Sequence, residues 1–208
     1  MLRPDMRRSS AVFVACLALT ALLAGALPLW PLASPARADR VCAQVHLSEK
    51  IDSLGEALVL NGLGVRRATF LNVKVYVAGL YLARPTTSIP EILQPARSKQ
   101  LTLHFVRHVS REDMLTAIRE GLLDNASSEA AAAEQHVLSM ERYLPDLHSG
   151  TVLRLAYRAK RGLHVFADDK LVGVEKDDTF ANLLFRIWLG PKPPDAGLKA
   201  GLLGGACD

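Results

Sequence analysis

Hydrophobic and polar residues alternate along much of the chain after residue 38, as strands with one buried face require. The clearest case is the segment 73–82, in which Tyr76, Ala78, Leu80 and Leu82 share one face. The segments predicted as strands are 57–60, 73–82, 99–109, 152–159, 163–167 and 170–174. The last three are close together in sequence, so we expect adjacent hairpins.

Helical spacing of apolar residues predicts helices at several points along the same region. Ser110 with Asp113 is typical of a helix N-cap, and Ser88 with Glu91 has the spacing of a capping box. The segments predicted as helices are 86–94, 110–125, 127–144, 178–189 and 194–203. This order of elements predicts an α+β domain, in which an antiparallel sheet has helices packed on one side.

Two polar residues interrupt the apolar pattern near residues 61–82. Arg66 follows Gly62-Leu63-Gly64, which is interpreted as a turn, and Tyr76 lies on the apolar face of the next strand. A guanidinium that faces an apolar sheet either binds an anion or keeps unmet hydrogen bonds, which are costly. Arg66 and Tyr76 are therefore candidate ligand-binding residues. The alternative is that Arg66 pairs with a glutamate or a helix C-terminus inside the fold, while the Tyr76 hydroxyl finds a neighbouring partner.

The first 38 residues have the pattern of an export signal. Three arginines precede a nearly uncharged apolar run over residues 11–32, and Ala36-Arg37-Ala38 supplies a cleavage pattern. The expected organisation is a signal peptide, 1–38, and one mature domain, 39–208, that is periplasmic or secreted. An uncleaved membrane anchor is the alternative, but Pro28 and Pro31 interrupt the apolar run.

The export segment also accounts for most of the positive charge. The full chain has 25 basic and 21 acidic residues, and four of the former and one of the latter lie in the signal. The mature domain therefore has 21 and 20, a formal net charge of +1. This near-neutral balance gives no argument for nucleic acid or an anionic membrane surface as partner. We expect a monomer with no membrane span once the signal is removed.

Cysteines and histidines supply a disulfide candidate but no metal site. Cys16 lies in the signal, which leaves Cys42 and Cys207 as a pair that would join the two ends in an oxidising compartment. Two free thiols are the alternative. His104 and His108 would lie about 13 Å apart along a strand, too far to share a metal. The other histidines are scattered and interpreted as surface or capping residues, so neither a metal nor a cofactor is expected.

Two segments of the chain resemble the bacterial branch of the chalcone isomerase-like proteins. They are LNGLGVRRATFLNVKVYVAGLYL at residues 60–82 and FANLLFRIWLGPKPPDAGLKAGLLG at residues 180–204. A G-x-G-x-R element leading into a K-x-Y-x-x-x-L-Y-L strand, followed far downstream by W-L-G-x-x-P, is an unusual combination. The resemblance implies an open-faced sandwich, with a ligand cleft between the antiparallel sheet and its helices.

The family contains enzymes that cyclise chalcones and relatives that bind fatty acids without catalysis. Arg66 matches the arginine that holds the substrate phenolate in the enzymes. Tyr76 stands where the enzymes have a threonine, and a tyrosine at this place is similar to the fatty-acid-binding relatives. The helix 110–123 lacks the tyrosine and asparagine of the enzymes, and Asn125 lies only at its end. Ile187 replaces a further threonine.

The resemblance therefore implies an exported, non-catalytic protein that binds a fatty acid or similar amphipathic carboxylate through Arg66 and Tyr76. One alternative is an isomerase or intramolecular lyase of an unsaturated carbonyl compound, in which Arg66 is the catalytic residue and stabilises an oxyanion. The other is a structural or partner-binding envelope protein whose cleft is filled by its own side chains. Trp188 and Phe185 are interpreted as core residues, because helical spacing alone explains them.

Overall fold

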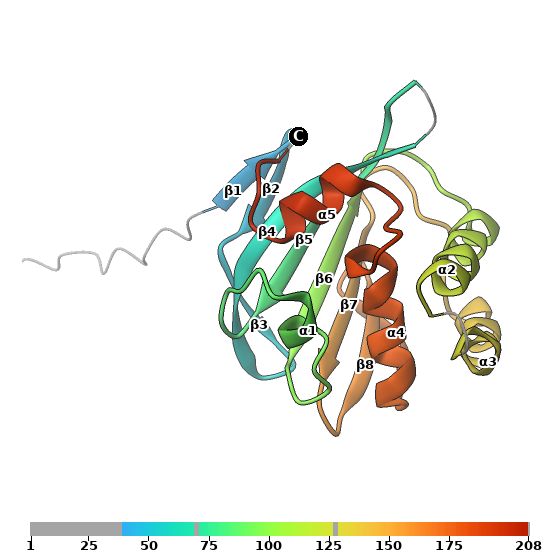
Figure 1. The fold of residues 1–208 in the computed structure, drawn as a ribbon. Coiled ribbons are helices and arrows are strands. Elements are labelled where there is room, and N and C mark those ends of the chain that lie inside the picture. The colour runs from blue at the N-terminus through green and yellow to red at the C-terminus, as the bar shows by residue number, and fades with distance from the viewer. Residues whose placement is uncertain (1–38, 69–70, 127–128, 208) are drawn as a thin grey trace, which may run out of the picture. The chain divides into compact units, whose positions relative to one another are not determined.

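A seven-stranded antiparallel sheet is the centre of the computed structural model, which describes residues 39–68, 71–126 and 129–207 (Figure 1). The strands pair in chain order, so each one lies beside its neighbours in sequence. They are β3 (Lys50–Ser53), β4 (Glu56–Ala68), β5 (Val73–Leu82), β6 (Lys99–Phe105), β7 (Val152–Arg158), β8 (Gly162–Ala167) and β9 (Lys170–Glu175). The predicted signal peptide lies outside the described residues.

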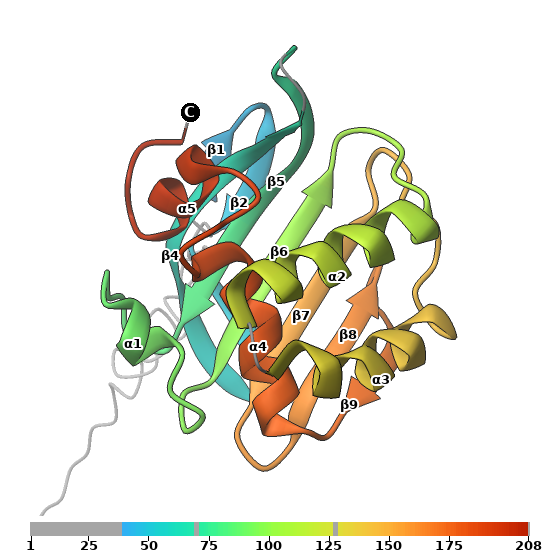
Figure 2. The ribbon, with the colours of Figure 1, turned by 45° about the vertical axis from the view of Figure 1, so that its right-hand side comes forward.

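Helices cover one face of this sheet (Figures 1 and 2). They are α1 (Ile89–Ile92), α2 (Arg111–Ala126), α3 (Ala130–Glu141), α4 (Asp178–Leu189) and α5 (Ala196–Leu202). In the two views α4 lies next to the sheet, and α2 and α3 pack against α4. The alternating residues of β5 from Tyr76 to Leu82 are buried in the core between the layers, as the sequence pattern predicts. The predicted α+β fold is thus confirmed.

Capping residues set the ends of the two helices that matter most for the candidate site. Asp177 accepts hydrogen bonds from the backbone N–H groups of Thr179 and Phe180, at 2.7 and 3.1 Å, and so begins α4. Ser110 accepts one from the N–H of Asp113 at 3.1 Å at the start of α2.

The predicted capping box of Ser88 and Glu91 does not form in α1. Its Ser88 side chain makes no capping hydrogen bond, and Glu91 instead accepts from Thr86 Oγ1 at 2.8 Å.

The interpretation of Gly62-Leu63-Gly64 as a turn is wrong. Both glycines lie in the middle of β4, where Gly62 pairs with Leu80 and Gly64 with Ala78. A Cβ atom on Gly62 would come within 2.2 Å of the Gly201 carbonyl oxygen, so the absence of a side chain lets α5 approach the strand. The glycines are therefore explained by helix packing, not by chain reversal.

A small hairpin covers part of the other face of the sheet. It consists of β1 (Asp39–Cys42) and β2 (Val45–Ser48) and packs on apolar residues of β4 and β5. Cys42 and Cys207 form a disulfide with their Cα atoms 5.9 Å apart and 165 residues apart in sequence. The bond ties the end of the described chain to this hairpin. No helix of the described residues is long and apolar enough to span a membrane.

A buried lysine connects α1 and α4 to β6. Lys99 is fully buried, and its Nζ donates to the carbonyl oxygens of Ile92 and Gln94 at 3.1 and 3.2 Å and to Asn182 Oδ1 at 2.7 Å. Ile92 is the last residue of α1 and Gln94 lies just beyond it, where carbonyl groups lack helical partners. Burial is the main cause that lowers the pKa of Lys99 from 10.5 to about 8, against the smaller opposing effect of Asp178.

A second buried polar cluster ties α3 to β9 and α4. The Glu175 carboxylate accepts hydrogen bonds from Ser139 and Tyr143 and contacts His136 Nδ1 at 3.1 Å. The other ring nitrogen of His136 lies 3.3 Å from Asp177 Oδ2. His136 is thus held between two carboxylates, a contact that its position in the sequence does not indicate.

Candidate ligand-binding site

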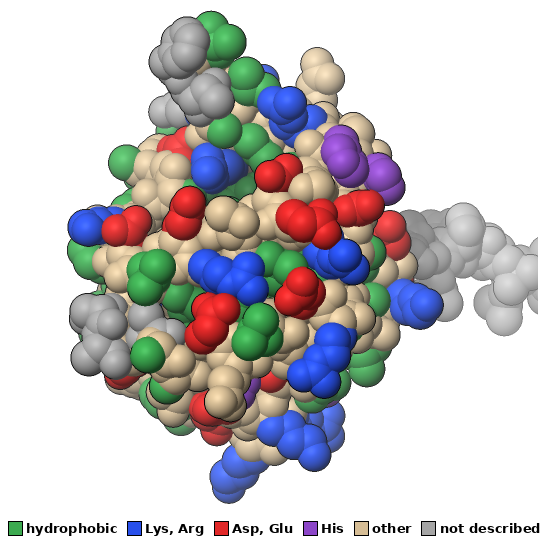
Figure 3. Space-filling model, turned by 90° about the vertical axis from the view of Figure 1, so that its right-hand side faces the viewer, with side chains coloured by type: hydrophobic (Ala, Val, Ile, Leu, Met, Phe, Trp, Pro, Cys, Tyr) green, Lys and Arg blue, Asp and Glu red, His purple; other side chains and the backbone are tan. Residues whose placement is uncertain are grey.

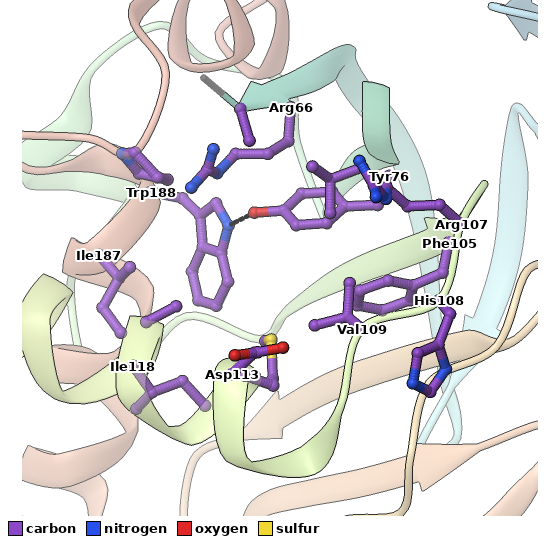
Figure 4. Close-up of a pocket in the computed structure, with 15 residues that line it drawn as sticks. Arg66, Tyr76, Phe105, Arg107, His108, Val109, Asp113, Ile118, Ile187 and Trp188 are labelled. Carbon is purple, nitrogen blue, oxygen red and sulfur yellow. Dashed lines mark hydrogen bonds between the residues drawn. The ribbon is translucent and has the colours of Figure 1, made fainter. Parts of the chain in front are cut away.

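A cavity of about 300 Å³ lies where β4, β5 and β6 approach α2 and α4 (Figure 4). Its polar lining comes from Arg66, Tyr76, Arg107, His108, Asp113 and Trp188. The apolar lining comes from Ala68, Val75, Phe105, Val109, Met114, Ala117, Ile118, Ile187 and Pro194. A concave, mostly apolar site with a few convergent polar groups is the usual form of a small-molecule site.

The structure brings Arg66 and Tyr76 together as direct cross-strand partners. They are paired in the β4–β5 register, immediately before a bulge between Arg66 and Arg67. Neighbouring residues on opposite strands project from the same face, so both side chains reach the cavity (Figure 4). The Asp195 carboxylate accepts a hydrogen bond from the backbone N–H of Arg67 at 2.9 Å and fixes this end of β4 against the start of α5.

The Arg66 guanidinium is half-buried and only partly satisfied. Its Nη1 donates to the Arg67 carbonyl oxygen at 2.9 Å. Across the described ranges, no carboxylate forms an ion pair with it. A guanidinium has five N–H donors, so most of this group stays available to a ligand. The alternative in which Arg66 pairs with a glutamate of the fold finds no support among these residues.

Tyr76 is hydrogen-bonded to a residue that sequence reasoning assigned only to the core. The indole Nε1 of Trp188 donates to the Tyr76 hydroxyl oxygen at 2.9 Å. The two residues are 5% and 2% exposed. Burial raises the pKa of Tyr76 to about 12, although the Trp188 hydrogen bond and the Arg66 charge act in the opposite direction. Tyr76 is therefore neutral at physiological pH.

Trp188 belongs both to the core and to the cavity wall, whereas Phe185 lies in the core. The two residues are three positions apart on α4, so they lie on the same side of the helix, about one turn apart along its axis. Only the fold shows which of them reaches the cavity. A sequence signal was present, however, because a buried tryptophan usually places its N–H next to an acceptor.

The opening of the cavity carries exposed polar groups. Arg107 and His108 lie at the surface on the segment that leads from β6 into α2, and Asp113 lies at the surface in the first turn of α2. Strand β6 ends at Phe105, earlier than predicted, so His108 lies beyond the strand. Its Nδ1 is 3.1 Å from Nδ1 of His148. The face formed by α2 and α3 shows basic and acidic side chains interspersed, without a continuous patch of either sign (Figure 3).

No metal site is found in the part of the chain that the structure describes. Among the described residues, no three histidine, cysteine, aspartate or glutamate side chains lie together so that they could hold a metal ion. The contact between His108 and His148 joins only two such side chains, and His104 is not part of it.

The sequence matches the model of the chalcone isomerase-like family over residues 39–204. The chain belongs to the chalcone isomerase-like family. Its fold is similar to the crystal structure of a fatty-acid binding protein of Arabidopsis thaliana, with a TM-score of 0.65 and 16% sequence identity. The match covers 80% of this chain and 96% of the plant protein. No curated protein sequence shows significant similarity to this chain.

Asn125 and Ile187, which were compared above with polar residues of the enzymes, make structural contacts here. Asn125, at the end of α2, accepts a hydrogen bond from the backbone N–H of Lys192 at 2.9 Å and donates to the carbonyl oxygens of Gly121 and Lys192. It therefore holds the loop after α4 and is not among the residues that line the cavity. Ile187 contributes an apolar side chain to the cavity wall instead of a hydroxyl group.

Proposed function

We propose that this chalcone isomerase-like protein binds a fatty acid or a similar amphipathic carboxylate in its cavity and does not catalyse a reaction. One observation carries the proposal. Arg66 and Tyr76 lie side by side at a largely apolar cavity, and the guanidinium has no carboxylate partner within the described residues. An apolar site with a half-buried cationic donor fits a ligand that has an anionic head and an apolar tail.

The expected energetics favour such a ligand. Arginine can bind a carboxylate with two parallel N–H donors, and each charge-assisted hydrogen bond contributes about 1.5 to 3 kcal/mol when it is desolvated. Each methylene of the tail that is buried adds about 0.8 kcal/mol. Ligand sites usually have volumes of about 300 to 1,000 Å³, so this cavity is small. We therefore expect medium-length tails to fit best.

The proposal does not include catalysis, because too few polar groups surround the expected position of the head group. Arg66 could stabilise an oxyanion, but the cavity has neither an asparagine nor a serine or threonine hydroxyl to orient a ketone or a water molecule. Asp113 and His108 lie at its exposed opening.

We also propose that the mature domain works outside the cytoplasm, in the periplasm or after secretion. Two features support this proposal. The first 38 residues have the pattern of an export signal, and Cys42 is bonded to Cys207. Disulfides of this kind persist in oxidising compartments and are rare where thiols are kept reduced. Detecting the processed chain in a periplasmic or culture fraction, with its mature N-terminus sequenced, tests this part.

A fluorescence titration tests ligand binding directly. The chain has two tryptophans, Trp30 and Trp188, and only Trp188 lies in the domain 39–208. Titration of this domain with decanoate should change the Trp188 emission to saturation, whereas 1-decanol should bind more weakly because it has no charge for Arg66. Absence of saturable binding by decanoate and by longer fatty acids would refute the proposal.

A matched pair of variants localises the binding. Arg66→Ala should weaken decanoate binding by at least about tenfold, the loss expected for one charge-assisted bond. Arg84→Ala removes the same charge from an exposed position that does not line the cavity, so it should leave the affinity unchanged. Equal losses in both variants would mean that binding depends on overall charge. Turnover of a chalcone above the rate in buffer would favour the enzyme alternative.

A further inference from the structure

We infer that Trp188 is a positioning residue that holds the Tyr76 hydroxyl as a hydrogen-bond donor toward the ligand. The inference rests on the proposed function and adds a specificity rule to it. With Trp188 in place, Arg66 and Tyr76 present only donors to the bound head group. The cavity would then select ligands whose head accepts hydrogen bonds, and carboxylates above all.

The direction of the hydrogen bond follows from the chemistry of the two groups. An indole N–H can only donate, whereas a phenol hydroxyl can both donate and accept. In the contact of 2.9 Å between Nε1 and the hydroxyl oxygen, Trp188 must be the donor and Tyr76 the acceptor. The Tyr76 hydrogen is thereby left for another partner. Among the residues that the structure describes, no acceptor for that hydrogen is found.

The surroundings hold both rings in place. Trp188 lies on α4 and Tyr76 in the interior of the sheet on β5, and both are buried. The Tyr76 ring also makes an edge contact with Phe105, with ring centroids 5.3 Å apart and an interplanar angle of 62°. Figure 4 shows the hydroxyl directed at the indole nitrogen, with the Arg66 side chain beside both groups. A donor that is already fixed loses little entropy when the ligand binds.

The protonation of Tyr76 is compatible with this role. Its pKa of about 12, raised mainly by burial, keeps the hydrogen on the hydroxyl at physiological pH, where a carboxylic acid is ionised. The phenol therefore donates to a bound carboxylate without repelling it. An ammonium head would be repelled by the Arg66 charge. An alcohol head would accept one hydrogen bond but would gain no charge interaction.

The test is a double-mutant cycle on ligand affinity, measured by calorimetry with octanoate. Trp188→Phe keeps an aromatic wall but removes the N–H, and it should weaken octanoate binding about fivefold, the equivalent of one neutral hydrogen bond. In a Tyr76→Phe background the same substitution should change the affinity by less than about twofold, because its target is gone. 1-Octanol should bind more weakly than octanoate to every variant, because its head gains no charge interaction with Arg66.

Other outcomes overturn the inference in recognisable ways. An equal loss with and without the Tyr76 hydroxyl would show that the indole acts as a wall for the tail. If wild-type protein binds octanol as tightly as octanoate, the head of the cavity does not select anions. Failure of the wild type to bind any carboxylate would remove the proposed function itself, and the inference with it.

A second replacement guards against misfolding of the phenylalanine variant. Since Trp188 is the only tryptophan of the domain 39–208, every tryptophan in that domain can be replaced by the analogue in which sulfur stands in place of the indole N–H. This change preserves the shape of the ring system and removes only the donor. It should reproduce the fivefold loss for octanoate, and an unchanged affinity would contradict the inference.

Discussion

Replacing the buried lysine should change the way in which stability depends on pH. Lys99 is fully buried, and its ammonium group is hydrogen-bonded to two carbonyl oxygens and one amide oxygen. These acceptors do not fully compensate for the loss of hydration, so the pKa falls from 10.5 to about 8. In Lys99→Met the titrating group is absent. The difference in the free energy of unfolding between the wild type and this variant, followed across pH, isolates the contribution of this lysine.

The sign and the size follow from proton linkage. Between about pH 8 and pH 10.5 the unfolded chain binds more protons than the folded one, because its Lys99 keeps the higher pKa. The free energy of unfolding therefore rises with pH in this range. A single group with these two pKa values contributes a rise of about 2.5 kcal/mol between pH 7 and pH 10. The penalty for burying the charge is fully present below pH 8.

Urea denaturation at pH 7, 8, 9 and 10 measures this contribution. The free energy of unfolding of the wild type minus that of Lys99→Met should rise by about 2.5 kcal/mol over the series. Taking the difference cancels other groups, such as the buried tyrosines, that titrate above pH 9. Lys176→Met, at an exposed position, should show no such trend. Parallel curves for the wild type and Lys99→Met would refute the reasoning, because they would mean that the ammonium is solvated in the folded protein.

Two further substitutions and the reduction of the disulfide test the packing, the cross-link and the buried polar contacts. Gly62→Ala should lower the free energy of unfolding by about 1 to 3 kcal/mol in urea denaturation, since its Cβ would overlap the Gly201 carbonyl oxygen; an unchanged midpoint would contradict close packing of α5 on β4. Reduction of the Cys42–Cys207 disulfide should release two thiols to a mass-tagging alkylator and lower stability by up to about 5 kcal/mol, as expected for so long a loop. Two reactive thiols before reduction would contradict the bond. Glu175→Gln should lower the free energy of unfolding by about 1 to 3 kcal/mol in thermal or urea denaturation, because the amide cannot satisfy all the donors that surround the carboxylate. An unchanged stability would show that the cluster is solvated.

Much of the fold could be predicted because its signals are local. The alternation in β5 identifies the buried face, and Asp177 and Gly190 mark the two ends of α4. The hairpin of β7 and β8 follows from two strand patterns separated by a short polar turn. Each of these signals acts between residues that are close in sequence.

The errors and omissions concern contacts between distant parts of the chain. Gly62 and Gly64 look like turn residues, but they are required by α5, which begins more than a hundred residues later. His136 is flanked in sequence by no acidic cluster, and only the packing of α3 on the sheet places it between Glu175 and Asp177. The periodicity of a single sequence does not show such contacts between distant segments.

The candidate site was predicted in the same uneven way. Arg66 and Tyr76 were found because each is unusual within its own strand, and the β4–β5 register places them together. Trp188 was missed as a site residue because its position on α4 is equally well explained by the core. The hydrogen bond that joins it to Tyr76 spans 112 residues and is a property of the folded chain alone.

The hydrogen bond between Asp195 and the backbone N–H of Arg67 joins residues 128 positions apart, whereas the strands of the sheet pair only with their sequence neighbours. The end of β4 that presents Arg66 is therefore held by α5 and not by the sheet alone. Local opening of α5 would disturb the site while the sheet stays intact. Binding and docking of α5 are then linked equilibria, so a bound ligand should slow amide hydrogen exchange in α5 more than in the strands of the sheet.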